Sequence, residues 1–173
     1  MKKTIFLLAT ISLMVSCGNN QQKTAETPQT EAPQTEAPAH NHDTSAKADE
    51  INVTINGTDQ MTFDVKEIRV KPGQRVNVTL HHSGSLPKTA MGHNFVLLKK
   101  GVDLPTFAEQ AMEAADNQYV PKGSKDVIAY TDLIGGGETT SVSFDAPTEA
   151  GSYDYICSFP GHYALMKGVL IVE

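Results

Sequence analysis

Short runs of alternating apolar and polar residues fill the segment 50–173 and constrain its fold more than any other feature. Such alternation over about four to eight residues is typical of β-strands with one buried face. Nearly continuous apolar runs of similar length are typical of strands buried on both faces. The alternating runs are Ile51–Ile55, Val76–Leu80 and Ser141–Phe144, and the continuous runs are Phe95–Leu98 and Gly168–Val172.

Turn residues separate these runs at short intervals. They are Asn56-Gly57, Lys71-Pro72-Gly73, Ser83-Gly84, Gly135-Gly136-Gly137 and Ala150-Gly151. Several short strands at this spacing predict an all-β domain, an antiparallel sandwich or barrel.

One segment has the period of a helix instead. It begins with a capping Asp103, has Pro105 in its first turn, and extends to about Asn117. We therefore expect one helix inserted between strands. The residues at helical spacing are Phe107, Ala108, Ala111, Met112 and Ala115.

The N-terminus has the pattern of an export signal over residues 1–16. Lys2 and Lys3 precede a short apolar run, Ile5–Val15, which is shorter than the roughly 20 residues that span a bilayer. The run ends in Met14-Val15-Ser16-Cys17, which resembles the cleavage and acylation site of bacterial lipoproteins. A transmembrane anchor and plain secretion are the alternatives. We predict a lipidated Cys17, and the absence of Asp in Gly18–Asn20 favours the outer membrane over the inner one.

Residues 17–49 differ in composition from the rest of the chain. Gln, Thr, Glu, Ala and Pro dominate, and Gln-Thr-Glu-Ala-Pro occurs twice in tandem. Such a segment buries too little apolar surface to offset the entropy of ordering it, so we interpret it as a flexible tether. His40 and His42 lie in it, either as a weak metal site or as solvated side chains.

The charge and the cysteine count exclude some classes of protein. The net charge is −6, and the scattered Lys and Arg residues form no basic stripe of a nucleic-acid-binding protein. The chain has two cysteines, Cys17 and Cys157. Each has a separate predicted role, so no disulfide is expected within segment 50–173.

The segment Cys157–Met166 offers a thiolate, an imidazole and a thioether, from Cys157, His162 and Met166. His93, which precedes a buried strand, is the best candidate for a second imidazole. Two imidazoles and a thiolate with a weak axial thioether suit copper in electron transfer. A zinc site would recruit another Cys, His or carboxylate in place of Met. A cysteine protease would need a cleft and a third orienting residue, and neither is evident.

These motifs resemble the azurins, bacterial members of the cupredoxin family of blue-copper proteins. The resemblance covers segment 50–173 and implies a Greek-key sandwich or barrel of about eight strands. The matching motifs are Asp59-Gln60-Met61, Leu86-Pro87-Lys88, Met91-Gly92-His93-Asn94, Val127-Ile128-Ala129, Leu133-Ile134-Gly135, Cys157 with Phe159-Pro160-Gly161-His162, and Ala164-Leu165-Met166-Lys167-Gly168.

The resemblance implies a role for each matching residue. His93, Cys157 and His162 would be equatorial copper ligands, and Met166 and the Gly92 carbonyl would be weak axial ones. Asn94 would link the two ligand loops by hydrogen bonds. Two further residues, Phe159 and Leu165, would keep water from the copper.

The resemblance also implies a docking surface for redox partners around the edge of His162. The expected partners are c-type cytochromes or a terminal reductase. The chain would be a periplasmic, monomeric electron carrier and not an enzyme, and copper storage or delivery is the alternative. The patch residues are Leu86, Met91, Met112, Pro160, Gly161 and Ala164.

The sequence departs from the azurin pattern at several positions. The usual disulfide, near Ile51 and Gly73, is missing, and Phe95 stands where azurins often have Trp. Tyr130 replaces a frequent His, and Tyr163 would enlarge the docking surface. His82 matches a family histidine near the site, although it is equally compatible with a hydrogen-bonded strand residue, and His81 beside it is expected to face solvent.

Overall fold

The computed structural model describes residues 49–173, and these form eight β-strands, two α-helices and one 3₁₀ helix. The strands are β1 (Glu50–Gly57), β2 (Glu67–Val70), β3 (Arg75–His82), β4 (Val96–Leu98), β5 (Val127–Tyr130), β6 (Thr139–Asp145), β7 (Gly151–Ile156) and β8 (Lys167–Val172). The helices are α1 (Lys88–Met91), α2 (Leu104–Met112) and the 3₁₀ helix η1 (Ala115–Asn117). Within this part of the chain, no helix is both long enough and apolar enough to cross a lipid bilayer.

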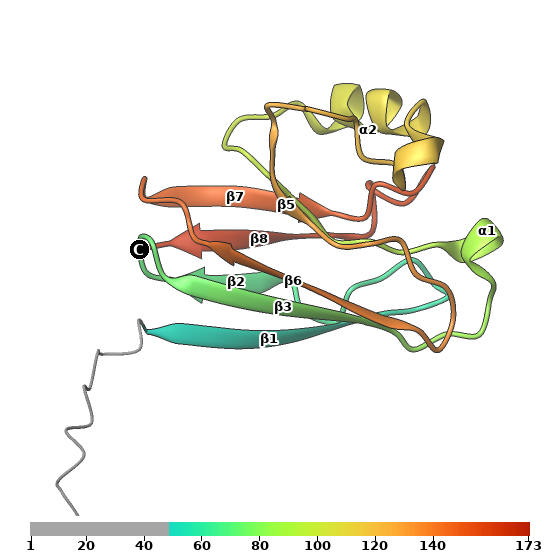
Figure 1. Ribbon diagram of the computed structural model, residues 1–173, viewed down its shortest axis with the longest axis horizontal. Helices are drawn as coiled ribbons and strands as arrows, with labels where there is room; N and C mark the ends of the chain where they lie inside the picture. The colour runs from blue at the N-terminus through green and yellow to red at the C-terminus, as the bar shows by residue number, and fades with distance from the viewer. Residues whose placement is uncertain (1–48) are drawn as a thin grey trace, which may run out of the picture. The chain divides into compact units, whose positions relative to one another are not determined.

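Two sheets face each other as the layers of a sandwich (Figure 1). One sheet has the strand order β1-β3-β6 and the other has β2-β8-β7-β4-β5. The chain passes from one sheet to the other after β1, β2, β3, β5 and β6. The predicted all-β sandwich of about eight strands is therefore confirmed, and the sheets stay open rather than closing into a barrel.

The prediction that all strands pair antiparallel is wrong for two pairs. β1 pairs with β3 in parallel, and β2 pairs with β8 in parallel. The remaining neighbours, such as β3 with β6 and β7 with β8, are antiparallel. Alternation of apolar residues shows which face of a strand is buried, but it carries no information about the direction of a partner far along the chain.

The core between the sheets follows the predicted alternation. In β3, Val76, Val78 and Leu80 are completely buried, and the residues between them are half-buried. Phe95, which stands where azurins often have Trp, is also completely buried, and its ring centroid lies 5.1 Å from that of Tyr155. Removing this apolar surface from water is the main stabilising contribution to such a sandwich.

The predicted helix is confirmed but ends earlier than expected. The Asp103 side chain accepts a hydrogen bond from the Thr106 N–H and caps α2, which ends at Met112. The chain then continues through η1, whose C-cap residue Gln118 is left-handed. Helix α1 was not predicted, because four residues are too few to show a helical period.

A second cluster of buried residues lies beneath α2. It contains Phe107 and Ala111 of α2 and Val96 of β4, and the half-buried Tyr163 packs against it. This packing joins the β7–β8 loop to the second cluster. The other part of Tyr163 reaches the surface, so its expected effect on the docking surface stays a prediction.

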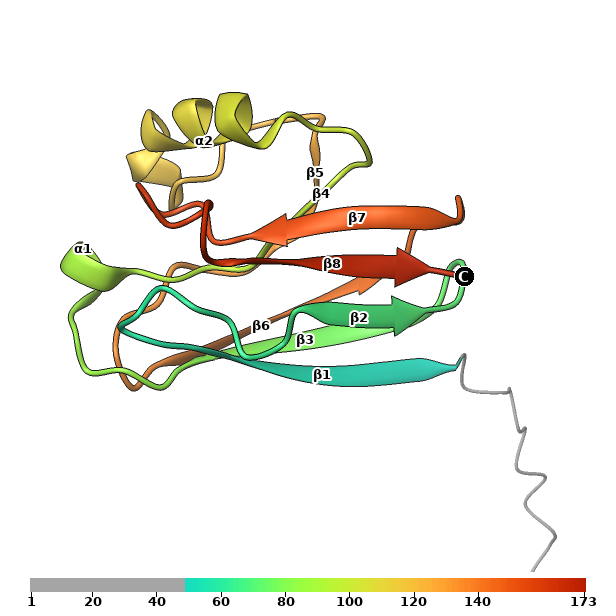
Figure 2. The same ribbon diagram turned by 180° about the vertical axis from the view of Figure 1, so that it is seen from behind.

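The loops that carry the predicted ligands meet at one end of the sandwich. The β7–β8 loop and α1 lie at this end, at the right of Figure 1, and the C-terminus lies at the opposite end. The view from behind shows the same arrangement (Figure 2). The ends of β1 and β3, at Gly57 and His82, also reach the ligand end.

Candidate metal centre

The β7–β8 loop brings three predicted ligands together through its own hydrogen bonds. Cys157 directly follows β7 and Met166 directly precedes β8, and the Cys157 N–H donates to the Met166 carbonyl at 2.9 Å. The Met166 N–H in turn donates to the His162 carbonyl at 2.8 Å. Gly161 has a φ of 81°, a left-handed conformation that glycine adopts without strain. The local sequence thus builds this half of the site.

His93 reaches the site from a different part of the chain. It forms a two-residue antiparallel bridge with Ile134, in which each N–H donates to the other's carbonyl at 2.9 and 2.8 Å. The bridge fixes the His93 backbone beside the loop that follows β5. Its side chain is completely buried.

The donor atoms of His93, Cys157 and His162 converge. The Cys157 Sγ lies 3.5 Å from Nδ1 of His162 and 3.9 Å from Nδ1 of His93, and all three atoms lie within 4.8 Å of one another. Metal bonds of about 2.0 Å to nitrogen and about 2.3 Å to sulfur would separate N from S by about 3.7 Å in a trigonal plane. The protein therefore holds these donors at the spacing of a metal site.

Met166 and the Gly92 carbonyl complete the surroundings of this cluster. Met166 is completely buried, and the Gly92 oxygen lies 3.7 Å from the Cys157 Sγ. Gly57 lies against both His93 and Met166, since a Cβ there would come within 2.8 Å of the imidazole and 2.9 Å of the thioether methyl. The sequence suggested a turn at this glycine, but it ends β1 and makes room for two ligands.

Burial keeps the donors in uncharged forms when no metal is bound. It raises the pKa of the Cys157 thiol to about 12 and lowers the pKa of His162 to about 4, with smaller effects on His162 from His93 and His82. Burial also lowers the pKa of His93. Neutral imidazoles have the free lone pair that a metal requires, whereas the thiol must release its proton on binding. Such a buried thiol is unsuited to be a protease nucleophile.

The His93 ring lies between two carbonyl oxygens, and this arrangement suits a cation. Nε2 lies 2.9 Å from the Thr58 oxygen, and Nδ1 lies 2.9 Å from the Gly92 oxygen. A neutral imidazole carries one N–H and can satisfy one of these acceptors. When Nε2 donates to the Thr58 carbonyl, a lone pair of Nδ1 faces a lone pair of the Gly92 carbonyl oxygen. Both atoms lie close to the Cys157 Sγ. A metal ion held by His93 Nδ1 would relieve this repulsion through its positive charge.

His82 supports the site without being a ligand. Its ring is completely buried and stacks on His93 with a centroid distance of 4.1 Å. Nδ1 accepts the Gly84 N–H, so the hydrogen on Nε2 donates to the Met91 carbonyl at 2.9 Å. His82 thus matches the hydrogen-bonded alternative. The neighbouring His81 is half-buried and lies 3.1 Å from the Thr139 hydroxyl.

Asn94 joins the two ligand segments. Its Oδ1 accepts the Ser158 N–H at 2.9 Å, and its Nδ2 donates to the Ser158 Oγ at 2.9 Å. Both side chains are buried, so these bonds form away from water. Sequence reasoning missed Ser158, although its position directly after Cys157 was a usable signal.

Of the predicted patch residues, Leu86 and Met91 lie next to or in α1, Pro160, Gly161 and Ala164 lie in the β7–β8 loop, and Met112 ends α2. Leu86, Met112, Gly161 and Ala164 are exposed, whereas Met91 and Pro160 are half-buried. His162 is 3% exposed, so no more than an edge of its ring reaches the surface. Of the predicted shielding residues, Phe159 is half-buried and its ring lies 4.8 Å from that of His162. The other, Leu165, is 59% exposed, and its shielding role stays a prediction.

The predicted export signal over 1–16 and all but the last residue of the predicted tether over 17–49 lie outside the described part of the chain, and so do three predicted lipidation or metal-site residues. They are Cys17, His40 and His42.

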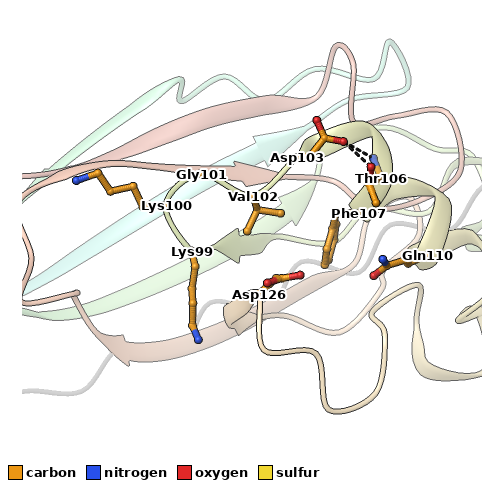
Figure 3. A pocket seen from close by; sticks show the side chains of 9 residues that line it. All are labelled: Lys99, Lys100, Gly101, Val102, Asp103, Thr106, Phe107, Gln110 and Asp126. Carbon is orange, nitrogen blue, oxygen red and sulfur yellow. Dashed lines mark hydrogen bonds between the residues drawn. The ribbon is translucent and has the colours of Figure 1, made fainter.

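Segment 49–173 contains no second group of His, Cys, Asp or Glu side chains close enough together to hold a metal ion. A surface pocket of about 400 Å³ lies between the loop after β4, helix α2 and the start of β5 (Figure 3). It has two acidic residues, Asp103 and Asp126, and the Asp103 side chain caps α2 through Thr106. Within the described residues, the set His93, Cys157 and His162 is the one group of His, Cys and acidic side chains that could hold a metal.

Comparison with known proteins indicates which metal the cluster of His93, Cys157 and His162 would bind. Residues 49–173 match the family described as copper binding proteins, plastocyanin/azurin family. The chain belongs to this family. Azurin-1 of Alcaligenes xylosoxydans xylosoxydans is 51% identical over 125 residues, which cover 70% of this chain and 96% of that protein. The azurin of Pseudomonas chlororaphis is 45% identical over 128 residues, with coverage of 72% and 99%.

Solved structures of family members have the same fold. Auracyanin A, a blue copper protein from Chloroflexus aurantiacus, has a TM-score of 0.66 at 33% identity and covers 72% of this chain and 99% of its own. An azurin (Az-iso2) from Methylomonas sp. strain J has a TM-score of 0.64 at 41% identity, with coverage of 70% and 97%. Together with the donor geometry, the family identifies the cluster as a type 1 copper site. Its ligands are His93, Cys157, His162 and Met166.

Proposed function

We propose that this protein carries single electrons between redox proteins and is not itself an enzyme. The observation that carries the proposal is a buried donor set, two neutral imidazoles with a thiol and a thioether, already assembled by hydrogen bonds within the protein. Bound copper would supply the one-electron chemistry by cycling between Cu(II) and Cu(I). The hydrogen bonds of the ligand segments should hold the donors in place through this change, and a small rearrangement would favour fast transfer.

The surface around His162 supports docking of a partner. Leu86, Met112 and Leu165 are exposed large apolar side chains at 40%, 49% and 59% exposure. Apolar contact without strong charge suits brief complexes, which an electron carrier needs for turnover. The proposed partners are c-type cytochromes or a terminal reductase, and the protein is proposed to bind them as a monomer.

Storage or delivery of copper is the alternative function. Delivery requires a site from which metal can leave, and the completely buried Cys157, His93 and Met166 oppose release. The discriminating experiment cycles the copper-loaded protein between reductant and oxidant in the presence of a copper chelator. We expect full recovery of the oxidised spectrum over repeated cycles. Loss of copper to the chelator in the reduced state would instead support delivery.

We further propose that the protein is a periplasmic lipoprotein. Support comes from the sequence: Lys2 and Lys3, the short apolar run and Cys17 form a lipoprotein signal, and segment 17–49 has the composition of a tether. Acyl chains on Cys17 would hold the copper domain near the outer membrane. Radiolabelled palmitate should label the wild-type protein in cells. The Cys17→Ser variant should remain unlabelled and leave the membrane fraction, and retention there would contradict the proposal.

A further inference from the structure

We infer that the left-handed pair Gln118–Tyr119 is a positioning element that holds the copper-ligand segments in place before the metal binds. The inference rests on the proposed copper function. It concerns residues that bind no metal themselves and act through Asn94, Ser158 and Phe159.

The backbone of this pair is strained. Gln118 and Tyr119 both have a φ of 61°, in the left-handed region that residues other than glycine rarely occupy. In segment 49–173 the other non-glycine residue with a positive φ is Met61, so two of three such residues are adjacent here. Strain of this kind persists where the surroundings over-determine the backbone, and it gathers at functional sites.

The two carbonyls of the pair each hold one ligand segment. The Gln118 carbonyl accepts a hydrogen bond from Asn94 Nδ2 at 3.0 Å, and the Tyr119 carbonyl accepts one from Ser158 Oγ at 2.6 Å. Asn94 directly follows the ligand His93, and Ser158 directly follows the ligand Cys157. Successive left-handed residues thus place neighbouring acceptors where both ligand segments can donate to them.

The Gln118 side chain reaches a third segment. Its Oε1 accepts the Leu133 N–H at 2.7 Å, and its Nε2 donates to the Asp132 carboxylate at 2.8 Å. Leu133 precedes Ile134, whose backbone pairs with His93. Gln118 therefore constrains His93 from both sides, through Asn94 and through the Ile134 bridge.

The Tyr119 ring extends the same constraint to the other imidazole. Its centroid lies 5.1 Å from that of Phe159 in an edge-on contact, and the Phe159 ring lies 4.8 Å from that of His162. Phe159 also closes over Gly92, where a Cβ would lie 2.8 Å from the Phe159 ring. A single turn thus contacts the surroundings of three ligands, His93, Cys157 and His162.

Every one of these contacts is made within the protein, so they are present without copper. Such a brace should resist movement of the donors when the copper changes its oxidation state. Loss of supporting groups around metal ligands typically weakens metal affinity about 10- to 100-fold. We expect an effect in that range when the brace is removed.

The test compares Tyr119→Ala, which removes the ring, with Tyr119→Phe, which keeps it. Copper affinity is measured by competition with a chelator, and the Cu(II) absorption spectrum and reduction potential are recorded. Tyr119→Ala should bind copper about 10-fold more weakly or worse, with shifted absorption and potential, and Tyr119→Phe should restore wild-type values. Tyr130→Ala, at an exposed tyrosine on β5, is the matched control and should behave as the wild type.

A milder variant guards against misfolding. Gln118→Asn keeps a residue that tolerates the left-handed region but is too short for the bonds to Asp132 and Leu133. It should shift the imidazole NMR signals of His93 in the metal-free protein. If Tyr119→Ala and Gln118→Asn lower thermal stability but leave copper affinity, spectrum and these signals unchanged, the pair is merely structural and the inference fails. A wild type that binds copper in place but does not cycle would instead refute the proposed function.

Discussion

The two ends of the sandwich use polar groups in opposite ways. At the copper end, His82, His93, Asn94 and Ser158 are buried and mostly bonded to each other or to backbone carbonyls. At the far end, charged side chains meet in solvent. The ion pairs there are Asp49–Lys71, Glu67–Arg69, Arg69–Glu173, Arg75–Asp145 and Lys100–Glu149.

This difference shows where the fold holds its geometry most tightly. A buried hydrogen-bonded group costs its full desolvation penalty when its partner is removed, so each side chain at the copper end is fixed by its neighbours. An exposed ion pair gains little because water and salt screen it. The copper end should therefore respond strongly to single substitutions, and the far end should tolerate them.

The largest effect should come from Cys157→Ser. A hydroxyl lacks the soft thiolate that binds copper and produces the blue colour, so we expect the complete loss of the intense visible band. Absorption spectroscopy after addition of Cu(II) checks this. A variant that stays intensely blue would show that Cys157 is not the ligand.

Asn94→Ala should be the most destabilising change for the metal-free protein. It leaves the buried Ser158 N–H without its acceptor, and we expect a loss of about 1–3 kcal/mol in the free energy of unfolding. Urea denaturation measures it. Asn77→Ala, which removes hydrogen bonds between strands at the sandwich surface, is the control and should cost less. Equal losses would remove the contrast between the two ends.

Acid should weaken the copper end before it affects the far end. The pKa of His162 is lowered from 6.5 to about 4 by burial, so between these values the unfolded chain binds a proton that the folded metal-free protein does not. Stability therefore falls as the pH drops from about 6.5 to about 4. Urea denaturation of the metal-free protein across this range should show the slope, and His162→Gln should reduce it. A wild-type stability that stays flat across this range would contradict the assignment.

The smallest effect should come from Arg69→Ala at the far end. Arg69 pairs with Glu67 and Glu173, but its side chain is 54% exposed. We expect little or no change in melting temperature and none in the copper spectrum. Thermal unfolding with and without high salt checks this, and a large loss would show that the far end is also a stabilising network.

Local patterns predicted much of the site and less of the fold. The ligands Cys157, His162 and Met166 lie within ten residues, so spacing alone groups them. The alternation of apolar residues predicted the sandwich and the burial of β3. The parallel pairs β1–β3 and β2–β8 escaped prediction because they join segments that are far apart in the chain.

The backbone conformation of individual residues was the other feature that the sequence did not predict. Gln118 and Tyr119 give no sign in the sequence that they adopt the left-handed region, because a non-glycine residue does so only under tertiary constraint. Asn56-Gly57 predicted a turn, since Asn-Gly is a common turn pair, but both residues belong to the end of β1. The real requirement at Gly57 is space for His93 and Met166, which come from distant segments.

The visible spectrum of the wild-type protein tests the central claim most directly. On addition of one equivalent of Cu(II), the site formed by His93, Cys157, His162 and Met166 should give an intense blue charge-transfer band. The band should vanish on reduction and return fully on oxidation, without loss of copper. A protein that stays colourless with Cu(II), or that binds Cu(I) alone, would contradict the assignment of an electron-carrying type 1 site.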